Sequence, residues 1–107
     1  MFRSIEIYNF LLDNCVGYDN RVKASYLMEK FQIEDHKTFR SYIEAARLNP
    51  VLEYCISSEA GKNGGYWIAT TKSEKNTALI NLMARGEKMI SNANILRKKK
   101  LYEVAKN

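Results

Sequence analysis

The sequence predicts a mainly α-helical protein with one small β-hairpin and a long C-terminal helix. Three observations support this fold class. Apolar residues recur at helical spacing in three segments before residue 49, and Asn63-Gly64 lies between two short runs that favour strands. After residue 72 the helical pattern continues almost to the end without a proline. A chain of 107 residues fits one small domain with a modest core.

The N-terminal half contains three predicted helices. The first covers residues 2–15 and the second residues 24–30, because their apolar side chains recur every three or four positions. Asp35 can cap the third helix, since its carboxylate can accept the free backbone N–H groups of the first turn. The third helix should end before Pro50, because the residue that precedes a proline avoids the α region.

A hairpin should follow the third helix. Residues 52–58 and 66–71 are rich in strand formers. Asn63-Gly64 is typical of a type I′ turn, whose two central positions both need positive φ. Trp67 is expected to pack against the helices, rather than to serve as a stacking platform for single-stranded nucleic acid.

The C-terminal helix is predicted to begin with a capping box formed by Thr71 and Glu74. Residues 73–106 would then span about 51 Å, whereas a small domain is only about 30 Å across. The helix therefore breaks, returns onto the domain, or projects and pairs with a second copy. Apolar spacing close to a 3.5-residue repeat favours a homodimer through Leu82, Met83, Met89, Ile90, Ala93 and Leu96.

Composition narrows the function classes. The formal net charge is +5, and residues 72–107 hold nine basic and three acidic residues. Nucleic acid is the first partner that such a distribution suggests, and a solvated lysine-rich helix is the structural alternative. One histidine, no C-x-x-C pair and no catalytic motif predict neither a metal, a cofactor nor an enzyme. Cys15 and Cys55 are expected to be buried reduced thiols.

Neither a membrane-spanning apolar run nor a signal-peptide pattern is found, so we expect a soluble cytoplasmic protein. Within it, residues 21–71 resemble a winged helix-turn-helix of the kind that bacteriophages and prophages encode. The stretch RVKASYLMEKFQI looks like the first helix of the turn motif, and EDHKTFRSYIEAAR looks like its recognition helix. Gln32, where the turn often has glycine, and Glu44, an acid in the recognition face, depart from that pattern.

The second half of the resemblance concerns the wing and the C-terminus. The stretch CISSEAGKNGGYWIATTKSE looks like the wing and its exit strand, and NLMARGEKMISNANILRKKK looks like the long trailing helix of that group. The resemblance therefore implies two parts. Residues 1–72 would be the winged helix-turn-helix domain, and residues 73–107 would be a long helix for dimerisation with a basic end.

This resemblance implies sequence-selective binding to double-stranded DNA, as a transcriptional regulator or a phage DNA-metabolism accessory factor in a bacterial host cell. The third helix would enter the major groove with its N-terminal half at the base edges. Lys37 and Arg40 would donate to guanine, and Glu44 would accept from cytosine. The candidate DNA-binding residues are His36, Lys37, Thr38, Arg40, Ser41, Glu44, Lys62, Asn63, Arg97, Lys98, Lys99 and Lys100.

A different class of function remains open from the sequence. Residues 21–71 carry a net charge of only +1, and the wing offers a single lysine, Lys62. These features favour a protein-interaction module that keeps the scaffold without binding DNA, such as a phage protein that inhibits a host protein. A DNA-binding protein should align Lys37, Arg40, Lys62 and the C-terminal lysines on one surface.

Overall fold

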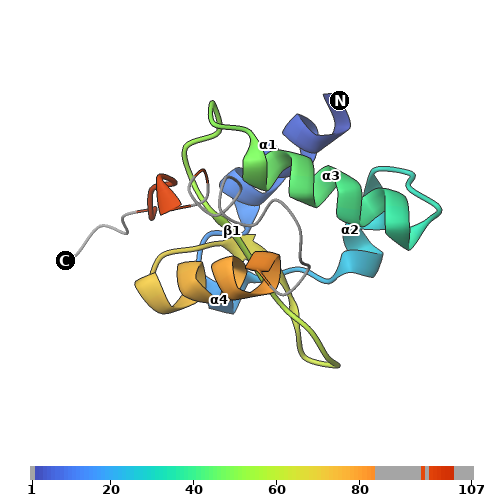
Figure 1. Cartoon of the computed structure of the whole chain (residues 1–107). Helices are drawn as coiled ribbons and strands as arrows, with labels where there is room; N and C mark the ends of the chain where they lie inside the picture. The colour runs from blue at the N-terminus through green and yellow to red at the C-terminus, as the bar shows by residue number, and fades with distance from the viewer. Residues whose placement is uncertain (1, 84–94, 96, 103–107) are drawn as a thin grey trace.

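The computed structural model describes residues 2–83, 95 and 97–102. Four helices and a two-stranded antiparallel sheet are present in this part of the chain. In Figure 1, α1 and α3 lie on one side of the hairpin and α4 lies on the other. In chain order the elements are α1 (Phe2–Asn14), the 3₁₀ turn η1 (Tyr18–Asn20), α2 (Ala24–Lys30), α3 (His36–Leu48), β1 (Ile56–Glu59), β2 (Gly65–Ile68) and α4 (Lys72–Met83).

The first three helices confirm the boundaries expected from local signals. Asp35 caps α3, and its carboxylate accepts a hydrogen bond of 2.9 Å from the Thr38 N–H group. At the other end, α3 stops at Leu48 because Asn49 takes an extended conformation before Pro50. The helix is therefore held in register at both termini by residues of its own segment.

The hairpin forms, but the predicted type I′ turn is wrong. The strands pair as far as Glu59, which leaves residues 60–64 as the loop. Neither Asn63 nor Gly64 has a positive φ, whereas Gly61 has a φ of 102°. Gly64 is needed for close approach instead, since a Cβ atom there would lie 1.9 Å from the Glu59 carbonyl oxygen.

Strand β2 is paired along both of its edges. On the edge opposite β1, the Ile68 N–H group donates to the Cys15 carbonyl at 2.7 Å, and the Gly17 N–H group donates back to Ile68 at 2.9 Å. Val22 and Tyr66 exchange two further backbone bonds, of 2.9 and 2.8 Å. The segments on either side of η1 therefore close the second edge of the hairpin.

The core encloses both predicted thiols and the predicted tryptophan. Cys15 and Cys55 are buried and free, as expected. Trp67 is 3% exposed, which confirms its expected place against the helices. The main cluster joins α1, α2, α3 and the hairpin, and its largest fully buried side chain is Phe39 of α3.

The start of α4 confirms half of the predicted capping box. The Glu74 N–H group donates to the Thr71 hydroxyl at 3.2 Å, as such a box requires. The Glu74 carboxylate, however, accepts from the Thr70 N–H group at 2.9 Å and from the Trp67 indole N–H at 3.0 Å. A buried indole needs an acceptor, so the carboxylate joins the helix start to the core rather than closing the local box.

One continuous helix through residues 73–106 is wrong at residues 98–102, which are not helical. Lys100 lies parallel to Tyr54, and its N–H group donates to the Glu53 carbonyl at 2.7 Å. The Cys55 N–H group donates in turn to the Lys100 carbonyl at 3.3 Å. The chain thus returns to the domain, where these otherwise unpaired backbone groups outweigh helix propensity.

The turn between α2 and α3 contains a strained residue. Gln32 has a φ of 56°, in the left-handed region that side chains other than glycine rarely adopt. Two backbone bonds fix this turn, from Gln32 to the Glu29 carbonyl at 3.2 Å and from Ile33 to the Met28 carbonyl at 2.8 Å. The departure from glycine at this position therefore has an energetic cost.

Replacing Gln32 with glycine should raise the free energy of unfolding by about 0.5–1 kcal/mol, because relief of the left-handed strain exceeds the added entropy of the unfolded chain. Urea denaturation followed by circular dichroism measures this change. Glu34→Gly is the matched control in the same exposed turn, and it should lower stability. Equal effects of the two substitutions would contradict the assignment of strain to Gln32.

Candidate nucleic-acid interface

Helix α3 separates a buried face from an exposed one. Its exposed side carries the predicted reading residues, and its buried side faces the core. The first turn and a half supplies most of the exposed set. Exposed are His36, Lys37, Thr38, Arg40 and Ser41; Glu44 is half-buried; Phe39, Ile43, Ala46 and Arg47 are buried.

Local hydrogen bonds engage the two hydroxyl groups of this face. The Thr38 hydroxyl donates to the Asp35 carboxylate at 2.8 Å, and the Ser41 hydroxyl donates to the Thr38 carbonyl at 2.7 Å. The bonds from Thr38 also lower the pKa of Asp35 below its usual value. The exposed cations Lys37 and Arg40 are therefore the strongest donors that this face presents to a partner.

The hairpin tip exposes Lys62 and Asn63, and two basic residues hold its backbone. The Arg21 guanidinium donates to the Asn63 carbonyl at 2.7 Å and lies 4.0 Å over the ring of Tyr18. The Lys23 ammonium donates to the Lys62 carbonyl at 2.9 Å. Sequence analysis missed both basic residues, because they precede α2 and no local pattern connects them with a loop 40 positions later.

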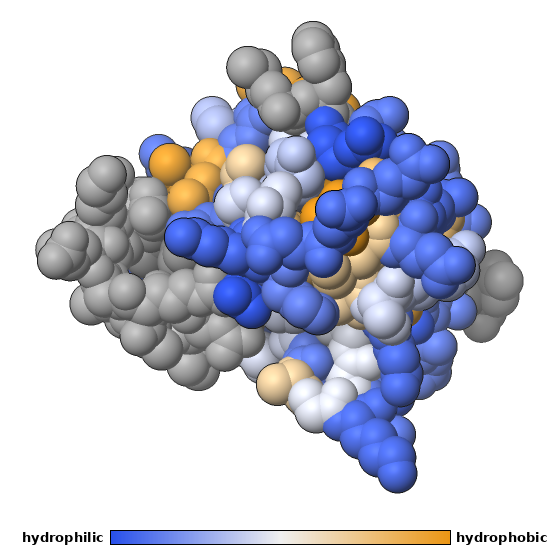
Figure 2. Space-filling model, turned by 90° about the vertical axis from the view of Figure 1, so that its right-hand side faces the viewer, coloured by the Kyte–Doolittle hydropathy of each residue, from blue (hydrophilic) through white to orange (hydrophobic). Residues whose placement is uncertain are grey.

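The N-terminal end of α3, helix α2 and the hairpin tip lie on one side of the molecule (Figure 1). Figure 2 shows that this side is mostly hydrophilic, with a smaller apolar area near its middle. Its charge is mixed, because exposed acids alternate with the exposed cations. The acids are Glu29, Glu34, Asp35 and Glu59, and the cations include Lys23, Lys37, Arg40 and Lys62.

The basic C-terminal residues lie elsewhere. Arg97, Lys98 and Lys100 are exposed, but the segment that carries them lies away from α2 and the hairpin tip (Figure 1). It is next to the C-terminal end of α3, whose 13 residues extend about 20 Å. The single basic surface expected from the sequence is therefore divided between the two ends of α3.

Lys99 is not a surface cation, so the prediction that it contacts phosphate is wrong. Its side chain is 5% exposed, and its ammonium donates to the carbonyls of Ala46, at 3.4 Å, Asn49 and Leu52. The last carbonyls of a helix have no partners within the helix, and a cation there also meets the negative end of the helix dipole. Lys99 thus serves as a cap for α3.

The surroundings of Lys99 are unusual for an ammonium group. Burial lowers its pKa below the ordinary value, and its three acceptors are neutral carbonyl oxygens. Lys75 of α4 supports the same segment, since its ammonium donates to the carbonyls of Arg97 and Lys99 at 2.6 Å each. Lys100 makes only a surface ion pair with Glu53, at 3.8 Å.

The predicted dimer seam falls mostly outside the described part of the chain. Of Leu82 and Met83 the structure describes the backbone in the last turn of α4. The remaining predicted residues, Met89, Ile90, Ala93 and Leu96, lie outside the described residues.

Comparison with known proteins adds no further constraint. No protein family, curated protein or solved structure matches this chain. In the residues that the structure describes, no helix is long and apolar enough to span a membrane. The case for a function therefore rests on the arrangement of α3, the hairpin tip and the C-terminal segment.

The lowered pKa of Lys99 gives a pH-dependent contribution to stability. Between that lowered value and the ordinary 10.5, the unfolded chain binds more protons than the folded one, so the free energy of unfolding rises with pH. The stability of the wild-type protein minus that of Lys99→Met should therefore increase toward pH 10.5, by at most about 1.4 kcal/mol per pH unit.

Urea titrations of both proteins at a series of alkaline pH values measure this difference. Burial raises the pKa of Tyr8 and Cys15, but these groups are present in both proteins and cancel. Lys98→Met, at an exposed neighbouring position, should give a pH-independent difference. A flat difference for Lys99→Met as well would place its ammonium in water.

Proposed function

We propose that this protein binds double-stranded DNA sequence-selectively through a winged helix-turn-helix, as a transcriptional regulator or an accessory factor of phage DNA metabolism. The observation that carries the proposal is the exposure of Lys37, Arg40 and Ser41 on the face of α3 opposite the core. The short helix α2 and the tight turn at Gln32 precede that face. The hairpin tip lies on the same side of the molecule (Figure 1).

In this proposal the first half of α3 enters the major groove. Lys37 and Arg40 donate to O6 and N7 of guanine, and Glu44 accepts from N4 of cytosine. Lys62 lies at the hairpin tip and contacts a phosphate, while Arg21 and Lys23 keep the tip in place. Base contacts therefore come from one helix and positioning contacts from the wing.

The C-terminal segment has a secondary role in binding. Arg97, Lys98 and Lys100 are exposed at the opposite end of α3, where they add phosphate contacts that do not depend on sequence. Pairing of two copies through α4 and the residues after it would place two recognition helices on successive half-sites.

A specific observation favours a second candidate, a protein-interaction module. The face around α3 mixes acids with cations, and the buried Lys99 and the carbonyl-bound Lys75 serve the fold rather than a polyanion. Such a face suits a partner of mixed charge better than a duplex. The test of DNA binding separates the two candidates.

Fluorescence anisotropy with a labelled mixed-sequence duplex, titrated at several salt concentrations, tests the proposal. We expect log affinity to fall linearly with log salt. Lys37→Ala combined with Arg40→Ala should weaken binding by roughly tenfold or more and reduce the salt slope by about one to two.

The matched control is Lys98→Ala combined with Lys100→Ala, which removes the same charge at the other end of α3. It should weaken binding less than the first pair does. Equal losses would mean that net charge alone drives binding. No binding by the folded wild-type protein at low salt would exclude the DNA proposal and leave the protein-interaction module.

A further inference from the structure

The segment Lys99–Tyr102 occupies a groove bounded by four parts of the domain. Its ammonium group enters the carbonyl-lined end of α3, and α4 holds its backbone through Lys75. Its own peptide groups pair with residues 53–55, and the Tyr102 N–H group donates to the Ala69 carbonyl at 3.1 Å. The segment therefore binds as an extended peptide does in a strand-accepting groove.

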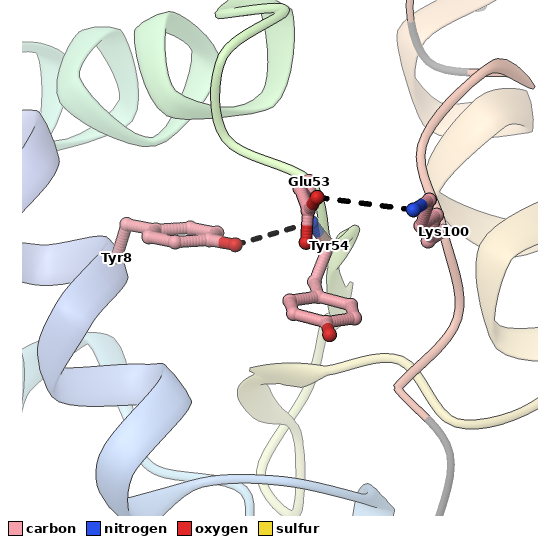
Figure 3. A network of polar contacts seen from close by, with 4 residues as sticks. All are labelled: Tyr8, Glu53, Tyr54 and Lys100. Carbon is pink, nitrogen blue, oxygen red and sulfur yellow. Dashed lines mark hydrogen bonds and ion pairs between the residues drawn. The ribbon is translucent and has the colours of Figure 1, made fainter.

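Side chains complete this docking. Leu101 packs against the small cluster formed by Cys55, Ala69 and Ala78. The rings of Tyr54 and Tyr102 lie 5.2 Å apart. Figure 3 shows Glu53 and Tyr54 between Lys100 on one side and Tyr8 of α1 on the other, and the Tyr8 hydroxyl accepts from the Tyr54 N–H group at 3.1 Å.

Two features distinguish this segment from a permanent part of the core. Its central contact buries an ammonium against neutral carbonyls, and desolvation offsets much of what the hydrogen bonds contribute. Its neighbours Lys98 and Lys100 are exposed, so only alternate side chains are held. Docking of low net stability is expected to open before the domain unfolds.

We propose that Lys99–Tyr102 is a detachable latch, docked by the chain itself in a groove that recognises an extended lysine-x-leucine-tyrosine segment. When docked it positions the C-terminal end of α3, through the carbonyls of Ala46 and Asn49, and covers Cys55. When open it exposes the backbone of residues 53–55 and the Cys55 thiol. The latch does not require that the protein bind DNA.

The two thiols give a direct test in the full-length protein, by alkylation with iodoacetamide and peptide mapping. Cys55 is 0% exposed beneath the latch, and Cys15 is 4% exposed in the main core. Static burial predicts that Cys15 reacts at least as fast as Cys55. Opening of the latch instead predicts that Cys55 reacts faster, and equal rates in the wild-type protein would overturn the proposal.

Charge reversal at the latch sharpens the test. Lys99→Glu places a carboxylate against the carbonyls of α3, so it should accelerate alkylation of Cys55 by roughly tenfold or more and leave Cys15 unchanged. Lys98→Glu, an exposed matched control, should change neither rate. Equal acceleration of both thiols would show that the segment opens only with global unfolding.

A peptide added in trans examines the groove itself. A capped peptide with the sequence RKKKLY of residues 97–102 should restore protection of Cys55 in Lys99→Glu. The same peptide with glutamate as its third residue should not, and equal protection by both would refute recognition of the lysine. If Lys99→Glu does not fold, Leu101→Ala replaces it, since it weakens the same docking without changing charge.

Discussion

The pairing of β2 on both edges is the constraint on which the other elements depend. One edge binds β1, and the other binds the backbone at Cys15, Gly17 and Val22. Gly65 permits this second contact, because a Cβ atom there would lie 2.6 Å from the Val22 carbonyl oxygen. The end of α1, the start of α2 and the hairpin are thereby fixed to one four-residue strand.

The position of α3 follows from this framework and from contacts at its two ends. Asp35 caps the N-terminus with an oxygen acceptor, and Lys99 caps the C-terminus with a nitrogen donor, as the direction of the helix dipole favours. Between them, the buried Arg47 donates to the Ile56 carbonyl at 2.9 Å and to the Ser58 hydroxyl at 2.8 Å. The exposed face thus has a defined orientation relative to the hairpin.

Local signals in the sequence were sufficient for the first three helices and for the burial of Trp67. The caps at Asp35 and Pro50 act over a few residues, so their neighbours contain the whole signal. The turn at Asn63-Gly64 was misread, because that dipeptide indicates positive φ only when the strands pair up to it.

The basic run at residues 97–100 shows why part of the candidate site could not be predicted. Four consecutive cations look alike in the sequence, and only contacts with carbonyls about 50 positions earlier determine that Lys99 is buried. The same holds for Arg21 and Lys23, whose partners are on the hairpin tip. Charge composition therefore indicated a class of partner without indicating which cations are available to it.

The contact between Trp67 and Glu74 has a practical consequence. The chain has one tryptophan, and its indole N–H group donates to a carboxylate at the start of α4. The emission of that indole therefore depends on the polarity and hydrogen bonding at the junction between the hairpin and α4. The protein carries an intrinsic optical probe there, and no label is needed to follow the docking of α4.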